Sequence, residues 1–133
     1  MNTWFEKSSP WASLAGRFLI AWIFIAAGYS KIGGYEGTAA YMTAMGVPGS
    51  LLPLVIFTEL AGGLLIVAGL FTRYTAVALA GFSILSGVLF HGDGSDQTQQ
   101  ILFMKNLAMA GGFLFLVTNG AGRISLDQRF GWK

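Results

Sequence analysis

The sequence predicts an all-α integral membrane protein: a bundle of four transmembrane helices, with a short interfacial helix between the first two. Of the 133 residues, 54% are hydrophobic and only 11% are charged, whereas soluble domains carry about 25% charged residues. The mean hydropathy is +0.62, and four segments approach the roughly 20 apolar residues that a helix needs to cross a bilayer. We therefore expect one membrane domain over residues 1–133, with the lipid bilayer as its main surroundings.

The four predicted spans cover residues 12–31, 51–71, 74–91 and 101–118. Arg17 interrupts the first span, Glu59 the second and Lys105 the fourth, whereas the third has no Asp, Glu, Lys or Arg. Short alternating apolar runs, which membrane β-strands would require, do not occur. Because Arg17 lies inside the apolar part of the first span, this segment does not fit a cleaved signal peptide.

Short connections are expected between the spans. The turn at residues 71–73 predicts antiparallel packing of the second and third helices, and residues 92–100 form a polar loop. The longer segment from 33 to 50 carries Tyr41, Met42 and Met45 at helical spacing. This spacing predicts an interfacial helix over about residues 37–46.

Basic residues are distributed unequally between the two ends of the predicted bundle. Lys31 and Lys105 lie near one end, and the other six lie at or nearer the opposite end: Lys7, Arg17, Arg73, Arg123, Arg129 and Lys133. An excess of Lys and Arg marks the cytoplasmic side of a membrane protein. We therefore predict that both termini and the turn at Arg73 are cytoplasmic.

Charges inside the spans are the most informative feature, because each costs several kcal/mol unless it is paired or hydrated. We expect Arg17 and Glu59 to form a structural ion pair, since helix rise puts them roughly 10 Å apart along the membrane normal and a long guanidinium side chain could cover much of that distance. The alternatives are that Arg17 extends to the inner headgroups and that Glu59 is protonated.

Polar residues near the other membrane surface form the predicted ligand site. Lys31, His91 and Lys105 could converge above Glu59, with Asn106 next in the chain to Lys105. Each also has a structural interpretation: His91 as an interfacial residue, and Lys105 as a lysine that extends to the headgroups. The candidate ligand-binding residues are thus Lys31, Glu59, His91, Lys105 and Asn106.

Stripes of mostly small residues predict how the four helices pack, since small residues let membrane helices approach closely. Phe24, Phe57 and Met109 are expected to supply apolar walls for the ligand site. The predicted stripes are Ala21, Phe24 and Gly28; Gly62, Gly63 and Ile66; Ala80, Ser83 and Gly87; and Ala108, Met109 and Gly112.

The composition also excludes several chemistries. The chain has no cysteine and one histidine, so disulfides, thiolate metal sites, iron–sulfur clusters and bis-histidine haem within one chain are excluded. A dinucleotide-binding fingerprint is also missing. We expect no metal and no covalently bound cofactor, and catalytic residues stay unidentified. With only 14 charged residues, the pI near 9.2 does not indicate a nucleic-acid partner.

Three stretches resemble the DoxX family of small four-helix membrane proteins. They run from GRF to AAGYSKI (16–32), from TELAGG to FTR (58–73), and from FH to FMKNL (90–107), and the similarity extends over about residues 15–127. The resemblance implies a multi-pass protein of the bacterial inner membrane. It also implies an association with quinol oxidase or thiosulfate–quinone chemistry, which leaves enzymatic activity open.

Three functions remain as alternatives. The first is an accessory subunit linked to redox metabolism that binds a quinone or another small amphipathic molecule. The second is a small proton-coupled transporter in which Glu59 exchanges protons near Arg17; four helices would then require dimerisation. The third is a non-catalytic assembly factor within a larger membrane complex.

Overall fold

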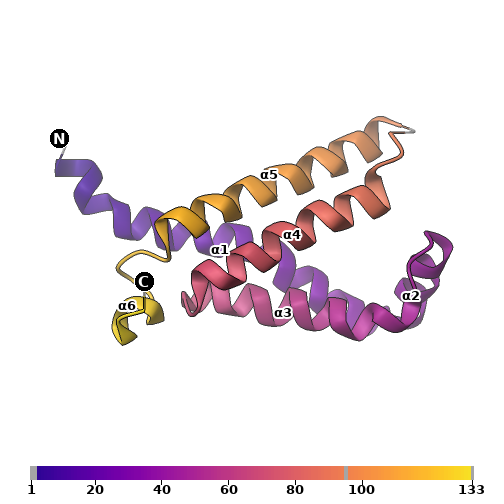
Figure 1. Cartoon of the computed structure of the whole chain (residues 1–133), viewed down its shortest axis with the longest axis horizontal. Helices are drawn as coiled ribbons and strands as arrows, with labels where there is room; N and C mark the ends of the chain where they lie inside the picture. The colour runs from indigo at the N-terminus through magenta and orange to yellow at the C-terminus, as the bar shows by residue number, and fades with distance from the viewer. Residues whose placement is uncertain (1–2, 95, 133) are drawn as a thin grey trace.

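The computed structural model describes residues 3–94 and 96–132, and the regular elements of this part of the chain are all helices (Figure 1). Among them, four are long and apolar enough to cross a membrane when α3 is taken with the 3-10 turn before it. The prediction of an all-α membrane protein is confirmed. The elements are α1 (Thr3–Gly33), α2 (Tyr35–Ala44), η1 (Gly49–Leu51), α3 (Leu52–Ala68), α4 (Thr72–His91), α5 (Gln97–Asn119) and α6 (Leu126–Phe130).

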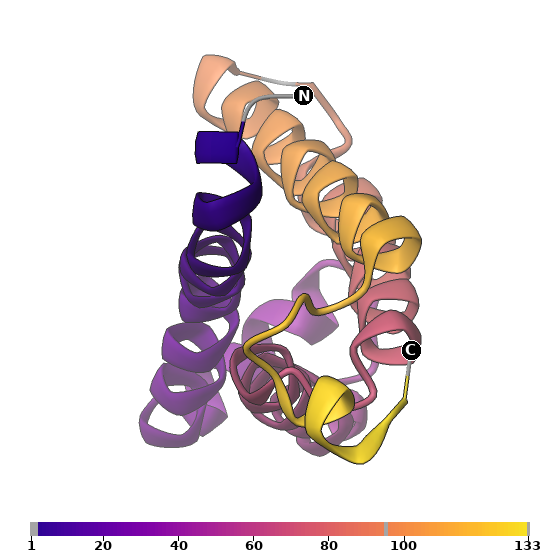
Figure 2. The ribbon, with the colours of Figure 1, turned by 90° about the vertical axis from the view of Figure 1, so that its left-hand side faces the viewer.

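The four spanning helices form two closely packed pairs. Helix α1 packs along α3, α5 packs along α4, and α3 meets α4 less extensively. Figure 2 looks along the bundle from the end that carries α6, and it shows the segment after α5 crossing that end towards α1 and α3. We call this the α6 end, and we call the opposite end, which carries α2, the α2 end.

Small residues set the spacing of α1 and α3. A Cβ added at Gly63 would lie 2.6 Å from Cγ1 of Ile25, and one added at Gly28 would lie 2.8 Å from Cγ of Leu60. Both distances are shorter than ordinary carbon contacts. The two helices therefore approach as closely as they do because neither position carries a side chain.

Three of the four predicted stripes are buried as expected, on α1, α3 and α4. The stripe on α5 was wrong, because its buried residues are Asn106, Ala110 and Phe113, while Ala108 is exposed. This face is turned by about 100° from the predicted one, which is a shift of one residue in an α-helix. Asn106, rather than Lys105, therefore points most directly into the bundle.

Helix boundaries differ from the predicted spans where capping groups act. Helix α3 ends at Ala68 because Gly69 takes a left-handed conformation (φ +69°), which lets the Leu70 N–H bond the Leu65 carbonyl at 3.0 Å. Helix α5 begins four residues earlier than predicted, because the Asp96 side chain accepts a hydrogen bond from the Gln99 N–H at 2.8 Å. Helix α1 also starts earlier, at Thr3 instead of residue 12.

Helix α2 (Tyr35–Ala44) agrees with the predicted interfacial helix to within two residues at each end. Helix α6 was not predicted, and it closes the α6 end of the bundle. Its Asp127 carboxylate accepts hydrogen bonds from the N–H groups of Phe71 (2.7 Å) and Thr72 (2.9 Å) at the start of α4. A negative charge is favourable there because the N-terminus of a helix carries partial positive charge.

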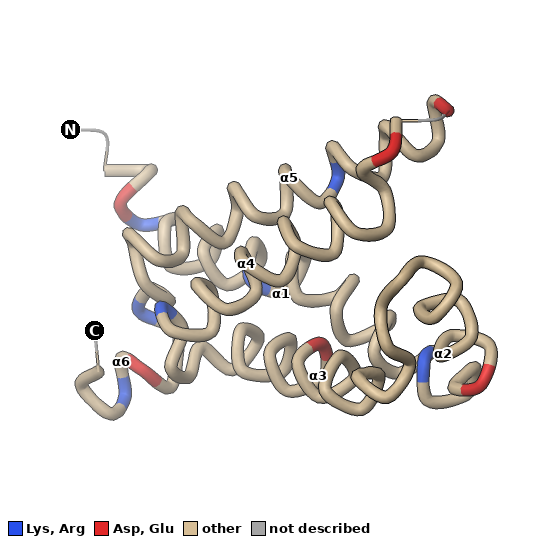
Figure 3. The backbone as a smooth tube through the Cα atoms, turned by 45° about the vertical axis from the view of Figure 1, so that its right-hand side comes forward, with Lys and Arg blue, Asp and Glu red and all other residues tan. Residues whose placement is uncertain are grey.

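Charged positions gather towards the two ends of the bundle, with few along the middle of the helices (Figure 3). Near the α6 end, Arg73 donates hydrogen bonds to the carbonyls of Val117 (2.6 Å) and Thr118 (2.8 Å) in the last turn of α5. A cation at a helix C-terminus complements the partial negative charge there. Which end faces the cytoplasm stays a prediction.

Candidate functional site

A cavity of about 450 Å³ lies near the α2 end of the bundle, with walls from all four spanning helices and a cover from α2. It is lined by every candidate ligand-binding residue: Lys31, Glu59, His91, Lys105 and Asn106. The structure thus brings together around one cavity five side chains that lie up to 75 positions apart in the sequence. That they bind a ligand stays a prediction.

Lys31 and Glu59 form an ion pair in the cavity wall. The distance between Lys31 Nζ and Glu59 Oε1 is 2.8 Å, and the side chains are 27% and 6% exposed respectively. Gly28, one helical turn before Lys31, allows this contact because a Cβ there would lie 3.2 Å from Cβ of Glu59. The nearly buried carboxylate is therefore balanced by a cation on the neighbouring helix.

The prediction of an Arg17–Glu59 ion pair is wrong. The Arg17 side chain is buried, and it donates hydrogen bonds to the carbonyls of Ile66 (3.2 Å), Val67 (3.0 Å) and Ile124. Two of these carbonyls belong to the last turn of α3, where backbone acceptors lack partners within the helix. Arg17 therefore caps the C-terminus of α3 and holds the segment after α5 against it.

The direction of side chains on α1 explains this outcome. Cα–Cβ bonds tilt towards the N-terminus of a helix, and the N-terminus of α1 lies at the α6 end (Figure 1). Lys31 consequently leans into the membrane, towards Glu59. Arg17 leans away from Glu59, towards the end of α3.

Asn106 is held in place by α4. Its side-chain nitrogen donates to the Ser83 carbonyl (3.0 Å) and to Ser86 Oγ (3.1 Å). Gly87 makes room for it, since a Cβ there would lie 3.0 Å from Cβ of Asn106. Within residues 3–94 and 96–132, Oδ1 of Asn106 makes no hydrogen bond and so leaves an acceptor beside the cavity.

His91 is oriented by the first turn of α5. Its Nδ1 lies 2.8 Å from Oε1 of Gln99. An amide oxygen only accepts hydrogen bonds, so Nδ1 carries the proton and, in the neutral ring, Nε2 is an acceptor. Gln99 was absent from the sequence prediction, because the start of α5 was placed two residues beyond it.

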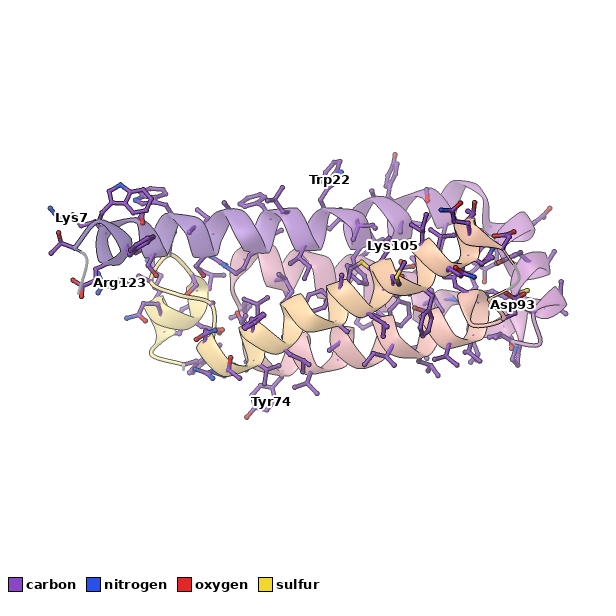
Figure 4. All side chains as sticks on the ribbon, turned by 90° about the horizontal axis from the view of Figure 1, so that it is seen from above. Lys7, Trp22, Tyr74, Asp93, Lys105 and Arg123 are labelled. Carbon is purple, nitrogen blue, oxygen red and sulfur yellow. The ribbon has the colours of Figure 1, made fainter. Side chains whose placement is uncertain are left out.

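Lys105 is the cavity's unpaired charge. Figure 4 shows it on α5 in the half of the molecule nearer Asp93 and away from Lys7 and Arg123. The described part of the chain offers it neither an ion pair nor a side-chain hydrogen bond. Because Lys31 and Glu59 cancel each other, the lining carries a net charge of one positive unit with His91 neutral.

Aromatic residues close the cavity on two sides. Tyr41 of α2 stacks on Phe90 with ring centroids 5.7 Å apart, which covers the α2 end. On the side nearer the α6 end, Phe24 packs edge-to-face against Phe82 and Phe113, with ring centroids 6.3 Å and 5.4 Å apart respectively. Edge-to-face pairs of this kind add stability beyond the burial of area, so the inner wall of the cavity is a firmly packed aromatic layer.

Comparison with known proteins shows the family to which the chain belongs. A model of the DoxX family matches residues 12–92, which is more than half of the chain. The chain belongs to the DoxX family. The resemblance seen in the sequence is thereby confirmed.

Two Escherichia coli proteins are similar to this DoxX-family chain over most of its length. Inner membrane protein YqjF is 50% identical over 115 residues, covering 86% of this chain and 88% of YqjF. Inner membrane protein YphA is 36% identical, with 94% of each chain covered. A Bacillus subtilis protein provisionally named an oxidoreductase, CatD, is 35% identical over 56% of each chain. No solved structure shows a significant match.

The DoxX match ends shortly after α4. It includes Lys31, Glu59 and His91 but stops before α5, which supplies Lys105 and Asn106. The part of the cavity that α5 contributes is therefore known from the structure of this chain and not from the family match.

The three predicted wall residues had different outcomes. Phe24 and Met109 line the cavity, whereas Phe57 is 68% exposed on the outer surface of α3 and belongs to a different, shallow apolar depression. Phe57 precedes Glu59 by two residues, which is about 200° around a helix. The two side chains therefore cannot share a face.

Sequence reasoning missed several polar lining residues. Thr38 and Tyr41 come from α2, and Ser86 comes from α4. Ser86 is three residues after Ser83 on the predicted small-residue stripe, so the 3.6-residue period could have indicated it. The part played by α2 had no comparable signal, because it depends on how the helix folds back over the bundle.

A second cavity of about 980 Å³ lies towards the α6 end between α1 and α5. Its lining includes Ile20 and Gly112, whereas Phe24 and Met109, about one turn further towards the α2 end on the same helices, line the first cavity. Among the described residues, no group of three or more His, Asp or Glu side chains could hold a metal ion.

Proposed function

We propose that this DoxX-family protein is an accessory subunit of the bacterial inner membrane that binds a small amphipathic, quinone-like molecule in the cavity at its α2 end. The observation that carries the proposal is one cavity that joins the five candidate side chains, and a few further hydroxyl groups, to mostly apolar walls. Binding sites for small molecules have this composition, with volumes of roughly 300–1,000 Å³.

The polar groups match the two redox forms of a quinone-like head. Lys31 and Lys105 can donate hydrogen bonds to the carbonyl oxygens of the oxidised form. Glu59, Oδ1 of Asn106 and Nε2 of His91 can accept them from the hydroxyl groups of the reduced form. Phe24 and Met109 offer apolar contacts to the body of the ligand. The same side chains can therefore bind both the oxidised and the reduced form of the ligand in one place.

Relatives give supporting context for membrane location and redox metabolism. YqjF and YphA are named inner membrane proteins, and the provisional name of CatD is that of an oxidoreductase. In this proposal the chain itself binds and orients the ligand, and electron transfer takes place with a partner protein or between diffusible molecules.

The test uses two alanines that differ only in where their side chains point. Ala27 lines the cavity, whereas Ala26, its neighbour on α1, is exposed on the outer surface. Binding of a short-tailed benzoquinone to the purified chain in nanodiscs is measured by equilibrium dialysis. We expect Ala27→Leu to weaken binding at least tenfold, because the larger side chain occupies the cavity, and Ala26→Leu to leave it within twofold. Equal binding by both variants, or no saturable binding by the unaltered chain, would refute the proposal.

A proton-coupled transporter is the second candidate, and the second cavity favours it. The two cavities approach each other from opposite ends along α1 and α5, as alternating access to a central site would require. Liposomes containing the chain and an internal pH indicator test this function. Acidification that depends on the chain and disappears with Glu59→Gln would support transport, whereas leakage equal to that of empty liposomes would oppose it.

A further inference from the structure

We propose that the cavity at the α2 end selects acidic amphiphiles, with one negative charge on a compact apolar body, and that Lys105 pairs with the charge. This inference rests on the proposed function, because it concerns the ligand of the same cavity. It adds a charge preference that a neutral quinone would not satisfy.

The charges facing the cavity come from each packed element in turn. Helix α1 contributes Lys31, α3 contributes Glu59, α4 contributes His91 and α5 contributes Lys105, while α2 contributes only uncharged side chains. Lys31 and Glu59 are 2.8 Å apart and neutralise each other. The only other charge of the described lining with His91 neutral is the ammonium of Lys105.

Acidic side chains of the α2 end do not compensate Lys105 from within the protein. Glu36, Asp93 and Asp96 are not among the residues that line the cavity, and the carboxylate of Asp96 caps the start of α5. Lys105 also forms no ion pair with an acidic residue in the described part of the chain. The cavity thus presents a cation that no acidic side chain in the described part of the chain balances.

The surroundings of Lys105 strengthen its preference for an anion. It is partly buried one turn after the polar start of α5, between Ile101 and Met109 along the helix. A charge near apolar walls interacts more strongly with a counter-ion than it would in water. An acidic ligand therefore gains an interaction that its neutral analogue lacks.

The size of the cavity restricts the body of this ligand. A volume of about 450 Å³ suits a compact molecule of one or two rings or a single short chain. A small free acid of this size fits inside the cavity entirely, whereas a phospholipid with two acyl chains would leave most of its apolar body outside. The geometry therefore favours a small free acid over a lipid headgroup.

The experiment compares two ligands of nearly identical shape, 2-naphthoate and its uncharged amide 2-naphthamide. Neither takes part in redox chemistry under these conditions. Their dissociation constants are measured at neutral pH by equilibrium dialysis with the purified chain in a neutral detergent. The readout is the ratio of the two constants for four proteins: the unaltered chain, Lys105→Gln, Lys105→Arg and Lys7→Gln. Each probe partitions into the micelles to the same extent in every sample, so partitioning cancels when the ratio is compared between variants.

We expect Lys105→Gln to shift this ratio by about tenfold or more against naphthoate, which corresponds to about 1.4 kcal/mol. Lys105→Arg should keep the preference because it keeps the charge, and this variant also shows that the position tolerates substitution. Lys7 lies exposed at the opposite end of the molecule (Figure 4), so Lys7→Gln should leave the ratio unchanged.

Three results would overturn the inference, and they separate its failure from that of the proposed function. If both probes bind and Lys105→Gln leaves their ratio unchanged, the charge selectivity is refuted while the binding function stands. If equimolar phosphatidylglycerol displaces naphthoate, the anion belongs to a lipid headgroup and the compact acid is refuted. If neither probe nor the benzoquinone binds, the cavity is not a ligand site and both proposals fail.

Discussion

Replacing Lys31 by methionine removes the cation next to a carboxylate that is only 6% exposed on its side chain. Stranding one member of a buried ion pair costs about 3–5 kcal/mol. Because the Lys31 side chain is 27% exposed, solvent partly screens the pair, and we expect a loss near the lower limit, about 3 kcal/mol. Glu59→Gln leaves a neutral amide of similar shape, and we expect it to cost about 1–2 kcal/mol.

The double substitution should cost less than the sum of the two single ones. With both charges gone, no ion remains buried, so we expect a total loss of about 2 kcal/mol and a coupling energy of about 2 kcal/mol or more. Unfolding free energies can be measured by titrating SDS into detergent micelles and following far-ultraviolet circular dichroism. The matched control is the cycle of Arg17→Met with Glu59→Gln, which should be additive within about 0.5 kcal/mol because the two residues share no partner.

The two cycles together decide which cation balances Glu59. Additive effects of Lys31→Met and Glu59→Gln would show that the 2.8 Å contact contributes nothing to stability. Coupling above about 1 kcal/mol between Arg17 and Glu59 would mean that the pair expected from the sequence forms after all. Either result would refute the assignment made from the structure.

Two further predictions concern packing and topology. Gly63→Ala should destabilise the protein by about 1–3 kcal/mol, because its Cβ would lie 2.6 Å from Ile25; Gly81→Ala, with nothing within 4 Å, should be neutral or slightly stabilising in the same SDS titration. Single cysteines at Thr98 and Gln128, added to this cysteine-free chain, should differ in intact cells: an impermeant maleimide should label position 98 and not position 128. The opposite labelling would reverse the predicted orientation. Equal destabilisation by the two alanine substitutions would refute the close packing of α1 and α3.

The spanning helices could be predicted because crossing a bilayer requires a length of apolar sequence that few other structures need. Their ends were less predictable, since they depend on single capping groups such as Asp96 and Gly69. Helix α6 has only five residues and would not be stable alone. Its position depends on Asp127 meeting the start of α4, which is a tertiary contact that no local pattern reports.

The sequence predicted which residues lie together around the cavity better than it predicted which of them form an ion pair. Depth along each helix places Lys31, Glu59, His91 and Lys105 near one end, and the cavity contains all four. Depth alone does not state which way a side chain leans, and this is why Arg17 was assigned to Glu59. The tilt of Cβ atoms towards the helix N-terminus was available from the sequence once the direction of α1 was known.

The closure of the α6 end has a consequence for how this protein is made. Thr72 receives its capping carboxylate from a residue 55 positions later, and Arg17 binds a carbonyl 107 positions later. During synthesis, α3 and α4 must therefore enter the membrane before the groups that complete their ends exist. A nascent chain stopped before residue 121 should insert its helices and pack α1 on α3, yet it lacks the Asp127 groups that bond Gly69, Phe71 and Thr72. A protease added at the α6 end should therefore cut the 69–71 turn until the last segment arrives.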